Sequence, residues 1–271
     1  MRLDPGTTLT LNQSISGGSI YKEGTGTLAF SSNSSLNGAL GIYAGKVTSS
    51  GNSLAQSLVI VNTGGTFSGS GNVGSLALAG GTIAPGGGTG AIVTTDVFSS
   101  PLQPSTLQFE FNLKGSPNYA DLSDSGNGLI SFADVTSGSV GSLSGNNVSI
   151  FLATPTLQNG DIFKGAFYVQ STSTISPTLL SGITFTYYLE SSTGTTTFDG
   201  QTFSLLNSSQ YTVNQSWISE SASFGGNSSI SGQIDEFTII SAPENGTLVM
   251  TSTGLLALLC LEYFRRRRFA Q

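Results

Sequence analysis

The sequence contains no histidine, and its single cysteine, Cys260, lies near the C-terminal end. Without histidine, the chain lacks the most common general base, the usual zinc ligand and the central member of a Ser-His-Asp triad. One cysteine allows neither an intrachain disulfide nor a thiolate metal cluster. These absences remove the most familiar catalytic and metal sites, so we expect no catalytic residue, no bound metal and no cofactor.

Charged residues are also scarce, because they make up 9% of the 271 residues. Few residues of the strongly helix-forming types are present, which argues against an α-helical protein and for an all-β class. The net charge is −6, yet four of the nine basic residues form one run near the C-terminus: Arg265, Arg266, Arg267 and Arg268. The rest of the chain is therefore acidic. An acidic body disfavours nucleic acid, which requires basic patches to displace phosphate counterions.

Glycine is abundant, with 36 residues, and it marks a repeat. Two Gly-Gly-Thr-apolar units begin at Gly64 and Gly80, 16 residues apart, with short apolar stretches between them. Glycine provides the positive φ angles that sharp corners need, and threonine and apolar residues suit strands. A corner, a strand and a second corner at nearly fixed spacing are typical of a β-solenoid, in which stacked turns bury one another's apolar faces.

The stretch from Gly65 to Gly86 resembles the autotransporter-associated β-strand repeat almost position by position, including its Ala-Pro-Gly ending. The stretch from Lys22 to Leu28 is similar to another part of the same repeat. A flexible linker or a phosphate-binding loop are the alternatives there, but Leu28 and Phe30 alternate as in a strand, and no helix follows. The resemblance implies a right-handed parallel β-helix over residues 1–115.

A less regular region follows, over residues 116–241. Just before it, Leu107, Phe109, Phe111 and Leu113 form the clearest period-two strand of the chain. Beyond about residue 140 the glycine rhythm loosens. The sequence there is compatible with an irregular continuation of the β-helix or with a β-sandwich-like cap. Further strands are expected at residues 148–152, 162–169, 183–189 and 237–240.

Residues 242–271 differ in composition from the rest. Within them, residues 247–264 carry one charge, Glu262. As a helix they would span about 27 Å, enough to cross the core of a bilayer. The arginine run that follows would place the C-terminus in the cytoplasm and the body across the membrane. A buried core helix with a solvated basic end is the alternative, but the arginines directly after the apolar span favour a transmembrane helix over residues 247–264.

The layout of this tail resembles the PEP-CTERM sorting signal. Pro243 and Glu244 match its Pro-Glu motif, an apolar span and an arginine cluster follow, and Asn245 stands where the family usually has a second proline. The resemblance implies export from a Gram-negative-type cell and processing near Pro243 by a membrane-embedded exosortase. The protein would be membrane-anchored at its C-terminus before processing, and would then reach the cell surface or the extracellular matrix.

The N-terminal segment carries no recognisable export signal. Met1 to Gly6 has no apolar stretch, and residues 8–11 already alternate as in a strand. Terminal turns of a solenoid normally carry a polar cap, and none is evident. We therefore expect the chain to begin inside a repeat array, with a signal peptide and further repeats upstream.

Two acidic clusters are the remaining candidates for chemistry. Asp121 to Gly128 resembles part of a calcium loop, but the twelfth position is Phe132, where an EF-hand loop needs glutamate. Asp235 and Glu236 are the only adjacent acidic pair, and neighbours in a strand point to opposite faces. A polysaccharide-acting site would also need a basic residue close to its acids. No basic residue outside the tail lies close in sequence to an acidic cluster.

These observations favour a non-catalytic surface or matrix protein. Its stacked turns would form a stiff rod that presents ladders of serine, threonine and asparagine side chains to exopolysaccharide or cell-surface glycans. A polysaccharide-acting enzyme on the same fold and a calcium-dependent carbohydrate-binding module are the alternatives. The expected partners are glycans, an exosortase-type enzyme and, through the tail, the membrane.

Overall fold

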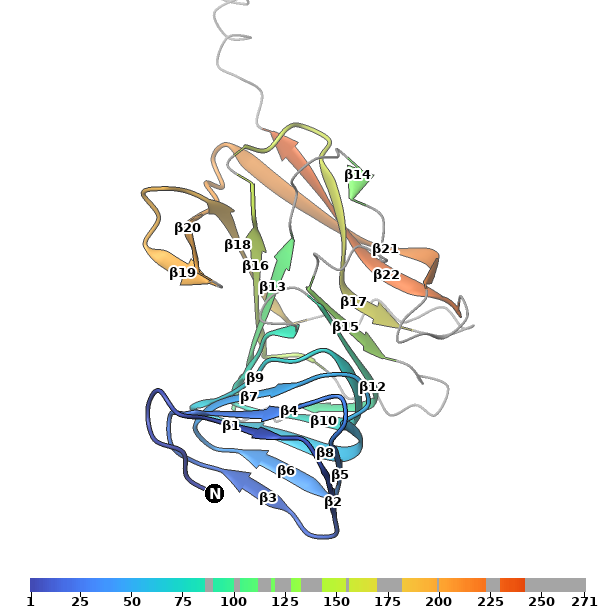
Figure 1. Ribbon diagram of the computed structural model, residues 1–271. Coiled ribbons are helices and arrows are strands. Elements are labelled where there is room, and N and C mark those ends of the chain that lie inside the picture. The colour runs from blue at the N-terminus through green and yellow to red at the C-terminus, as the bar shows by residue number, and fades with distance from the viewer. Residues whose placement is uncertain are drawn as a thin grey trace, which may run out of the picture.

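The computed structural model describes residues 1–85, 90–99, 103–111, 118–119, 128–132, 143–154, 156–169, 182–198, 200–222 and 230–241. Every named element within these ranges is a β-strand, and two ten-stranded sheets and one two-stranded sheet contain them all (Figure 1). The all-β class and the β-solenoid predicted from the sequence are confirmed, and the solenoid makes about four turns.

The first sheet runs the length of the molecule. Its strands down to β18 are all parallel, and the last two are antiparallel. In spatial order it contains β1 (Thr8–Leu11), β4 (Thr27–Phe30), β7 (Gly45–Ser49), β9 (Gly65–Phe67), β11 (Thr82–Ile83), β13 (Thr106–Phe111), β16 (Asn147–Leu152), β18 (Thr184–Glu190), β20 (Gln201–Leu205) and β19 (Thr196–Phe198).

The second sheet lies opposite the first. Its spatial order is β3 (Ile20–Lys22), β6 (Ala39–Ile42), β8 (Leu54–Asn62), β10 (Gly71–Ala79), β12 (Gly90–Ser99), β15 (Gly128–Phe132), β17 (Ile162–Val169), β22 (Ile230–Ser241) and β21 (Tyr211–Ala222), with β14 (Asn118–Tyr119) also paired to β17.

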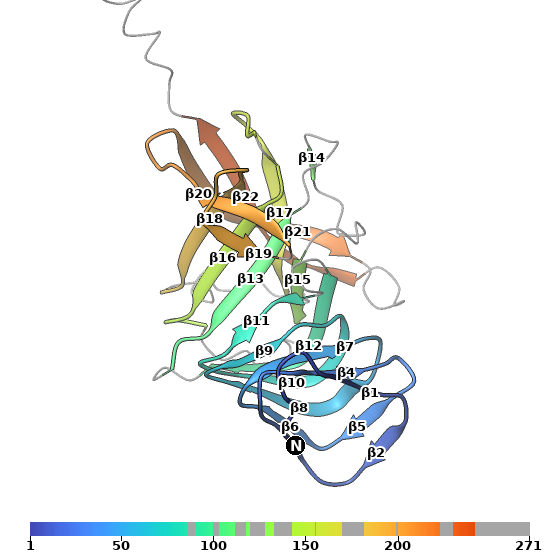
Figure 2. The same ribbon diagram turned by 60° about the vertical axis from the view of Figure 1, so that its left-hand side comes forward.

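A third, two-stranded sheet gives the first turns a triangular cross-section. It consists of β2 (Ser14–Ser16) and β5 (Ser35–Asn37), which pair in parallel on a third side of the coil (Figure 2). In the next turn the long strand β8 occupies both this side and the second sheet, since Leu36 donates its N–H to the carbonyl of Ser53 just before β8. The triangular cross-section of the first turns is thus replaced by two facing sheets in the later turns.

The turns stack because each presents an apolar column to its neighbours. Thr8 pairs with Thr27 and Thr27 with Lys46, steps of 19 residues each, so equivalent side chains lie directly above one another. Burial of one such leucine or valine contributes about 1.5–3 kcal/mol. The inward column of the first sheet contains Leu28, Val47, Phe67, Ile83, Leu107 and Val148, and the exposed Leu9 continues it at the end of the rod.

The corners depend on glycine where the chain approaches its own previous turn. Gly71 has a φ of 104°, and a Cβ atom on it would collide with the carbonyl oxygen of Gly51 one turn below. Beside this contact, the amide of Asn72 donates a hydrogen bond to the side-chain oxygen of Asn52. A side chain at residue 71 would therefore force two turns apart, which explains the glycine at this corner.

In the C-terminal region the strand pairing of both sheets changes from parallel to antiparallel. Parallel pairing continues through β18 in the first sheet and β17 in the second, and antiparallel hairpins then close each sheet: β20 and β19 in one, β22 and β21 in the other. The step between stacked residues also grows, because Thr106 pairs with Asn147, 41 residues later. These long connections account for the weaker glycine rhythm.

The composition of the core changes along the rod. Leucine, valine and isoleucine fill most of the early turns, with Phe30 and Phe67 among them, whereas aromatic rings become more frequent between the later strands. Phe109 contacts Phe167 with ring centroids 5.3 Å apart, and Phe163 stacks on Phe237 at 5.0 Å. Figure 1 shows that the two sheets diverge in this part of the molecule, and the larger rings fill the wider space between them.

Candidate functional site

The outer face of the first sheet carries one continuous column of polar side chains, here called the hydroxyl ladder. Each member alternates along its strand with the buried column, so it points outward. Neighbouring strands are about 4.8 Å apart, so the seven steps of the ladder cover roughly 33 Å. Its members are Thr8, Thr27, Lys46, Thr66, Thr82, Thr106, Asn147 and Thr184.

A groove, here called the terminal groove, opens between the two sheets at the C-terminal end of the rod. It has a volume of about 520 Å³. One side is formed by β18, the other by the start of β21, and the connection from β20 to β21 closes its end. The lining residues are Phe185, Thr186, Tyr187, Leu205, Leu206, Ser208, Tyr211, Thr212 and Val213.

The connection that closes the groove has a defined geometry. The side-chain oxygen of Asn207 accepts hydrogen bonds from the backbone N–H of Ser209 at 3.0 Å and from its hydroxyl at 2.7 Å. The carbonyl of Asn207 accepts the N–H groups of Gln210 and Tyr211, both at 3.0 Å. Leu206 donates to the carbonyl of Tyr187 on the opposite strand at 2.9 Å. These hydrogen bonds fix the turn that closes the groove.

Aromatic rings support the groove from inside the molecule. Phe185 and Tyr187 stack with centroids 6.3 Å apart, and each meets Phe237 edge-on, at 5.8 and 6.0 Å. Burial raises the pKa of the Tyr187 hydroxyl above its ordinary value, and the negative charge of Asp235 raises it further. Tyr187 is therefore a neutral hydroxyl at physiological pH, able to donate and accept hydrogen bonds.

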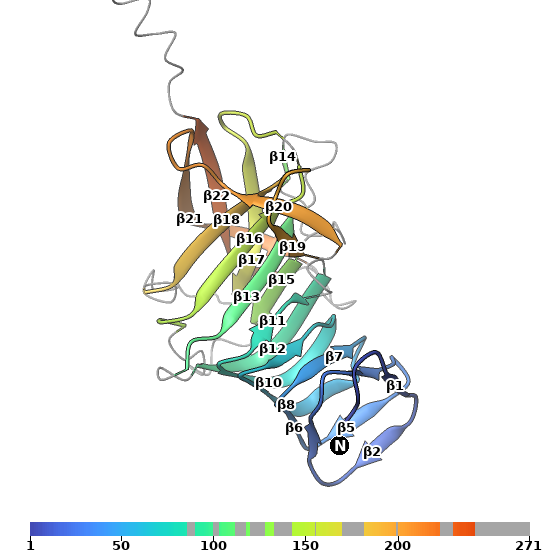
Figure 3. The same ribbon diagram turned by 90° about the vertical axis from the view of Figure 1, so that its left-hand side faces the viewer.

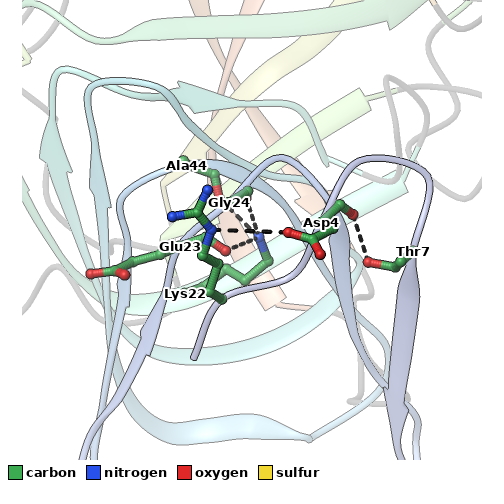
Figure 4. A network of polar contacts seen from close by, with 7 residues as sticks. Asp4, Thr7, Lys22, Glu23, Gly24 and Ala44 are labelled. Atoms are coloured by element: carbon green, nitrogen blue, oxygen red, sulfur yellow. Dashed lines mark hydrogen bonds and ion pairs between the residues drawn. The ribbon is translucent and has the colours of Figure 1, made fainter.

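Lys22, in the first turn, is among the largest fully buried side chains of the described residues, and Figure 4 shows it beside Glu23, Gly24 and Ala44. Its ammonium group donates to the carbonyls of Glu23 at 3.0 Å, Gly24 at 2.6 Å and Ala44 at 3.0 Å. Three donors thus meet three acceptors. Burial lowers the pKa of Lys22 from its ordinary value. This lysine joins two stacked corners, and its ammonium group is not accessible to a ligand.

The acidic pair Asp235 and Glu236 does not form a joint site. Asp235 is fully buried and Glu236 half-buried on the other face of β22. The β17 strand bulges opposite Asp235, since the register shifts between Lys164 and Tyr168. One carboxylate oxygen of Asp235 accepts the N–H of Phe167 in that bulge at 2.7 Å. The aspartate therefore adds a side-chain hydrogen bond to the backbone of this bulge.

A second buried acid lies under the β19–β20 hairpin. Figure 3 shows this hairpin across the outer side of the first sheet. Gln201 of the hairpin donates its side-chain amide to Glu110 of β13 at 3.1 Å. Beside them, Phe151 stacks on Phe198 at 4.3 Å and meets Phe203 edge-on at 5.1 Å. The hairpin buries a small aromatic cluster on the outer face and covers Glu110.

The predicted processing, membrane-orientation and calcium-loop residues lie outside the described residues. These are the Pro243-Glu244 motif, the run Arg265, Arg266, Arg267 and Arg268, and the acidic stretch from Asp121 to Asn127. Within the described ranges, no group of three acidic or sulfur-bearing side chains could hold a metal ion.

Among the residues that the structure describes, there is no helix with the length and apolar character needed to span a bilayer. The transmembrane helix predicted over residues 247–264 lies beyond them.

Comparison with known proteins does not assign the chain to a family. No family model matches it, and no curated protein matches it. The resemblances to autotransporter-type repeats and to the PEP-CTERM signal therefore stay predictions.

The terminal groove was not predicted, although the sequence contains a residue pattern that points to it. Phe185, Tyr187, Tyr211 and Val213 are spaced two apart within their strands and are only half-buried. Large apolar residues with that spacing indicate a strand face at the margin of a core. Their convergence across two distant strands cannot be deduced from spacing alone.

Proposed function

We propose that the protein is a non-catalytic, exported surface or matrix rod that binds polysaccharide along its hydroxyl ladder. The rod is a right-handed β-helix, and its stiffness comes from the stacked turns. Exopolysaccharide or cell-surface glycans are its partners. No cofactor takes part.

The single observation that carries this proposal is the register of the first sheet. Eight strands place a polar side chain at the same outward position, six of them threonine. Threonine hydroxyls both donate and accept hydrogen bonds, and polysaccharide chains present hydroxyl groups at repeated intervals. Because the β-sheet fixes the ladder, the protein loses little side-chain freedom on binding, and many weak contacts add up.

The buried acids support a non-catalytic role over the alternative of a polysaccharide-acting enzyme. Glycoside hydrolysis needs two carboxyl groups that flank the scissile bond in a groove open to substrate. Asp235 instead accepts a backbone N–H of β17, and Glu110 accepts the amide of Gln201 beneath a hairpin. Both carboxylates take part in holding strands together.

Delivery to the surface is the second part of the proposal. The described chain ends at Ser241, at the opposite end of the rod from the N-terminus (Figure 1). Pro243 and Glu244 follow directly, then the apolar span 247–264 and the run Arg265 to Arg268. An exosortase-type enzyme would act near Pro243 while residues 247–264 span the membrane as a helix. The rod would then be released to the surface or matrix.

Mass spectrometry of protein taken from the cell surface tests this delivery step. We expect a C-terminus near residue 244 rather than Gln271. Recovery of intact Arg268 from surface material would contradict processing and leave the polysaccharide-binding part of the proposal unaffected.

A glycan array tests the binding step, run with and without calcium beside a turnover assay on acidic polysaccharides. We expect binding to extended glycans that does not depend on calcium, and no turnover. Calcium-dependent binding would favour the carbohydrate-binding module, and release of oligosaccharides would favour the enzyme. Absence of binding to any polysaccharide would refute the proposal.

A further inference from the structure

We infer that the terminal groove is a second binding site, which takes one or a few rings of a neutral saccharide. The inference rests on the proposed function for the class of ligand. It adds a site at the C-terminal end of the rod, formed by β18, β21 and the connection before β21, and separate from the hydroxyl ladder.

The size and rigidity of the groove suit a small ligand. Its volume of about 520 Å³ falls in the range of roughly 300–1,000 Å³ that is usual for ligand sites. The Asn207 turn holds one end in place through four hydrogen bonds, and the contact of Leu206 with Tyr187 ties that turn to β18. A ligand would therefore enter a preformed shape and would not have to order a loop.

The lining combines apolar rings with hydroxyl groups. Phe185, Tyr187 and Tyr211 provide aromatic surface, and Ser208 and Thr212 provide exposed hydroxyls. A pyranose ring has the same two characters, because its C–H groups form apolar faces and its hydroxyls surround the edge. Aromatic surfaces cover such faces, while hydroxyl side chains bond the edge.

The charge of the site favours a neutral ligand over an acidic one. None of the nine lining residues is charged at neutral pH. The carboxylate of Asp235 acts on Tyr187 from within the core. A uronic acid would therefore meet no basic partner and would be repelled by a buried carboxylate.

The apolar tail of the same chain is the competing occupant. Ser241 pairs with Tyr211, so the chain leaves β22 beside the groove. However, a purely apolar segment would fit only part of a lining in which five of nine side chains carry a hydroxyl. A saccharide complements both the apolar and the hydroxyl side chains, so it is the occupant that we propose. The experiment below also detects occupation by the tail.

Calorimetric titration of the full-length chain tests the inference, in a zwitterionic detergent without a sugar headgroup. The probes are maltotriose, cellotriose and mannotriose, with trigalacturonate as the acidic comparison. We expect at least one neutral probe to bind more tightly than trigalacturonate. Tyr211→Ala should weaken that binding tenfold or more, and the conservative Tyr187→Phe by several fold. Tyr21→Ala, an exposed tyrosine of the first turns, is the matched control and should bind as the wild type does.

Three results would overturn the inference: no binding of any neutral probe, unchanged affinity in Tyr211→Ala, or tighter binding of trigalacturonate. Binding that appears only after residues 247–271 are removed would assign the groove to the tail instead. Failure of the proposed function is distinguishable. In that case trisaccharides still bind and respond to Tyr211→Ala, while long polysaccharide does not bind along the ladder.

Discussion

At the scale of single residues, two buried charged side chains of this protein form hydrogen bonds with backbone groups at corners and bulges. Lys22 meets three carbonyls at two stacked corners, and Asp235 meets the N–H of Phe167 in a bulge. Buried backbone groups without partners are costly, so a charged side chain can be retained in a core for this purpose.

Replacing Lys22 with methionine tests its structural role. Lys22→Met keeps most of the volume but removes the side-chain donor of the Gly24 and Ala44 carbonyls, while the Glu23 carbonyl keeps the N–H of Leu3, so we expect the free energy of unfolding to fall by about 3 kcal/mol. Urea denaturation measures the change. Lys46→Met, on the exposed ladder of the next turn, is the control and should alter stability by less than about 0.5 kcal/mol. Equal effects of the two substitutions would show that the ammonium group does not hold the corners.

Tyr187 predicts a pH dependence at the alkaline end. Its pKa is raised in the folded protein above the ordinary value of 10.0, so the unfolded chain loses this proton first as the pH rises. The stability linked to Tyr187 is therefore complete below pH 10 and is lost above it. Tyr187→Phe should flatten the fall in stability above pH 10, by up to about 1.4 kcal/mol per pH unit. Urea denaturation at several alkaline pH values measures this slope for the wild type, for Tyr187→Phe and for the control Tyr43→Phe. Parallel curves of stability against pH for the wild type and Tyr187→Phe would contradict the prediction.

At the scale of elements, the β19–β20 hairpin is the clearest addition to a plain solenoid. It folds over the outside of the first sheet and encloses Phe151 with two of its own rings, Phe198 and Phe203. Phe203 is fully buried, so Phe203→Ala should cost about 3–5 kcal/mol. Leu205→Ala in the same strand is the control, because Leu205 is 66% exposed and should contribute little. Thermal unfolding measures the stability of both variants. A small loss of stability for Phe203→Ala as well as for Leu205→Ala would show that the hairpin does not pack on the sheet.

Strands with strong local patterns could be predicted from the sequence. The Gly-Gly-Thr units became β9 and β11, which stack directly, with Thr66 beside Thr82. The alternation around Phe109 became β13, and the stretch 162–169 is β17. In each case the pattern lies within a few consecutive residues and reports which face is buried.

Features that depend on distant partners could not be predicted. The antiparallel closure of both sheets arises from hairpins at their ends, and sequence spacing does not say which strand a hairpin joins. Glu110 and Gln201 are 91 residues apart, and their contact exists only because the β19–β20 hairpin folds back. The terminal groove likewise joins Tyr187 to Tyr211 across the gap between two sheets.

At the scale of the whole molecule, the protein is a rod with a continuous polar face and a groove at one end. The hydroxyl ladder would contact long polysaccharide chains, and the terminal groove would take a short saccharide. A rod of this kind could hold two glycans at once, and the linked sites would bind a matrix more firmly than either site alone.

Binding along the ladder is the central claim, and co-sedimentation of the full-length protein with exopolysaccharide tests it most directly. Thr66→Val combined with Thr82→Val removes two neighbouring hydroxyls while keeping side-chain shape and strand preference. We expect this double variant to bind several fold more weakly than the wild type, and Thr197→Val, an exposed threonine of β19 outside the ladder, to bind as the wild type does. Equal binding by all three proteins would contradict the account.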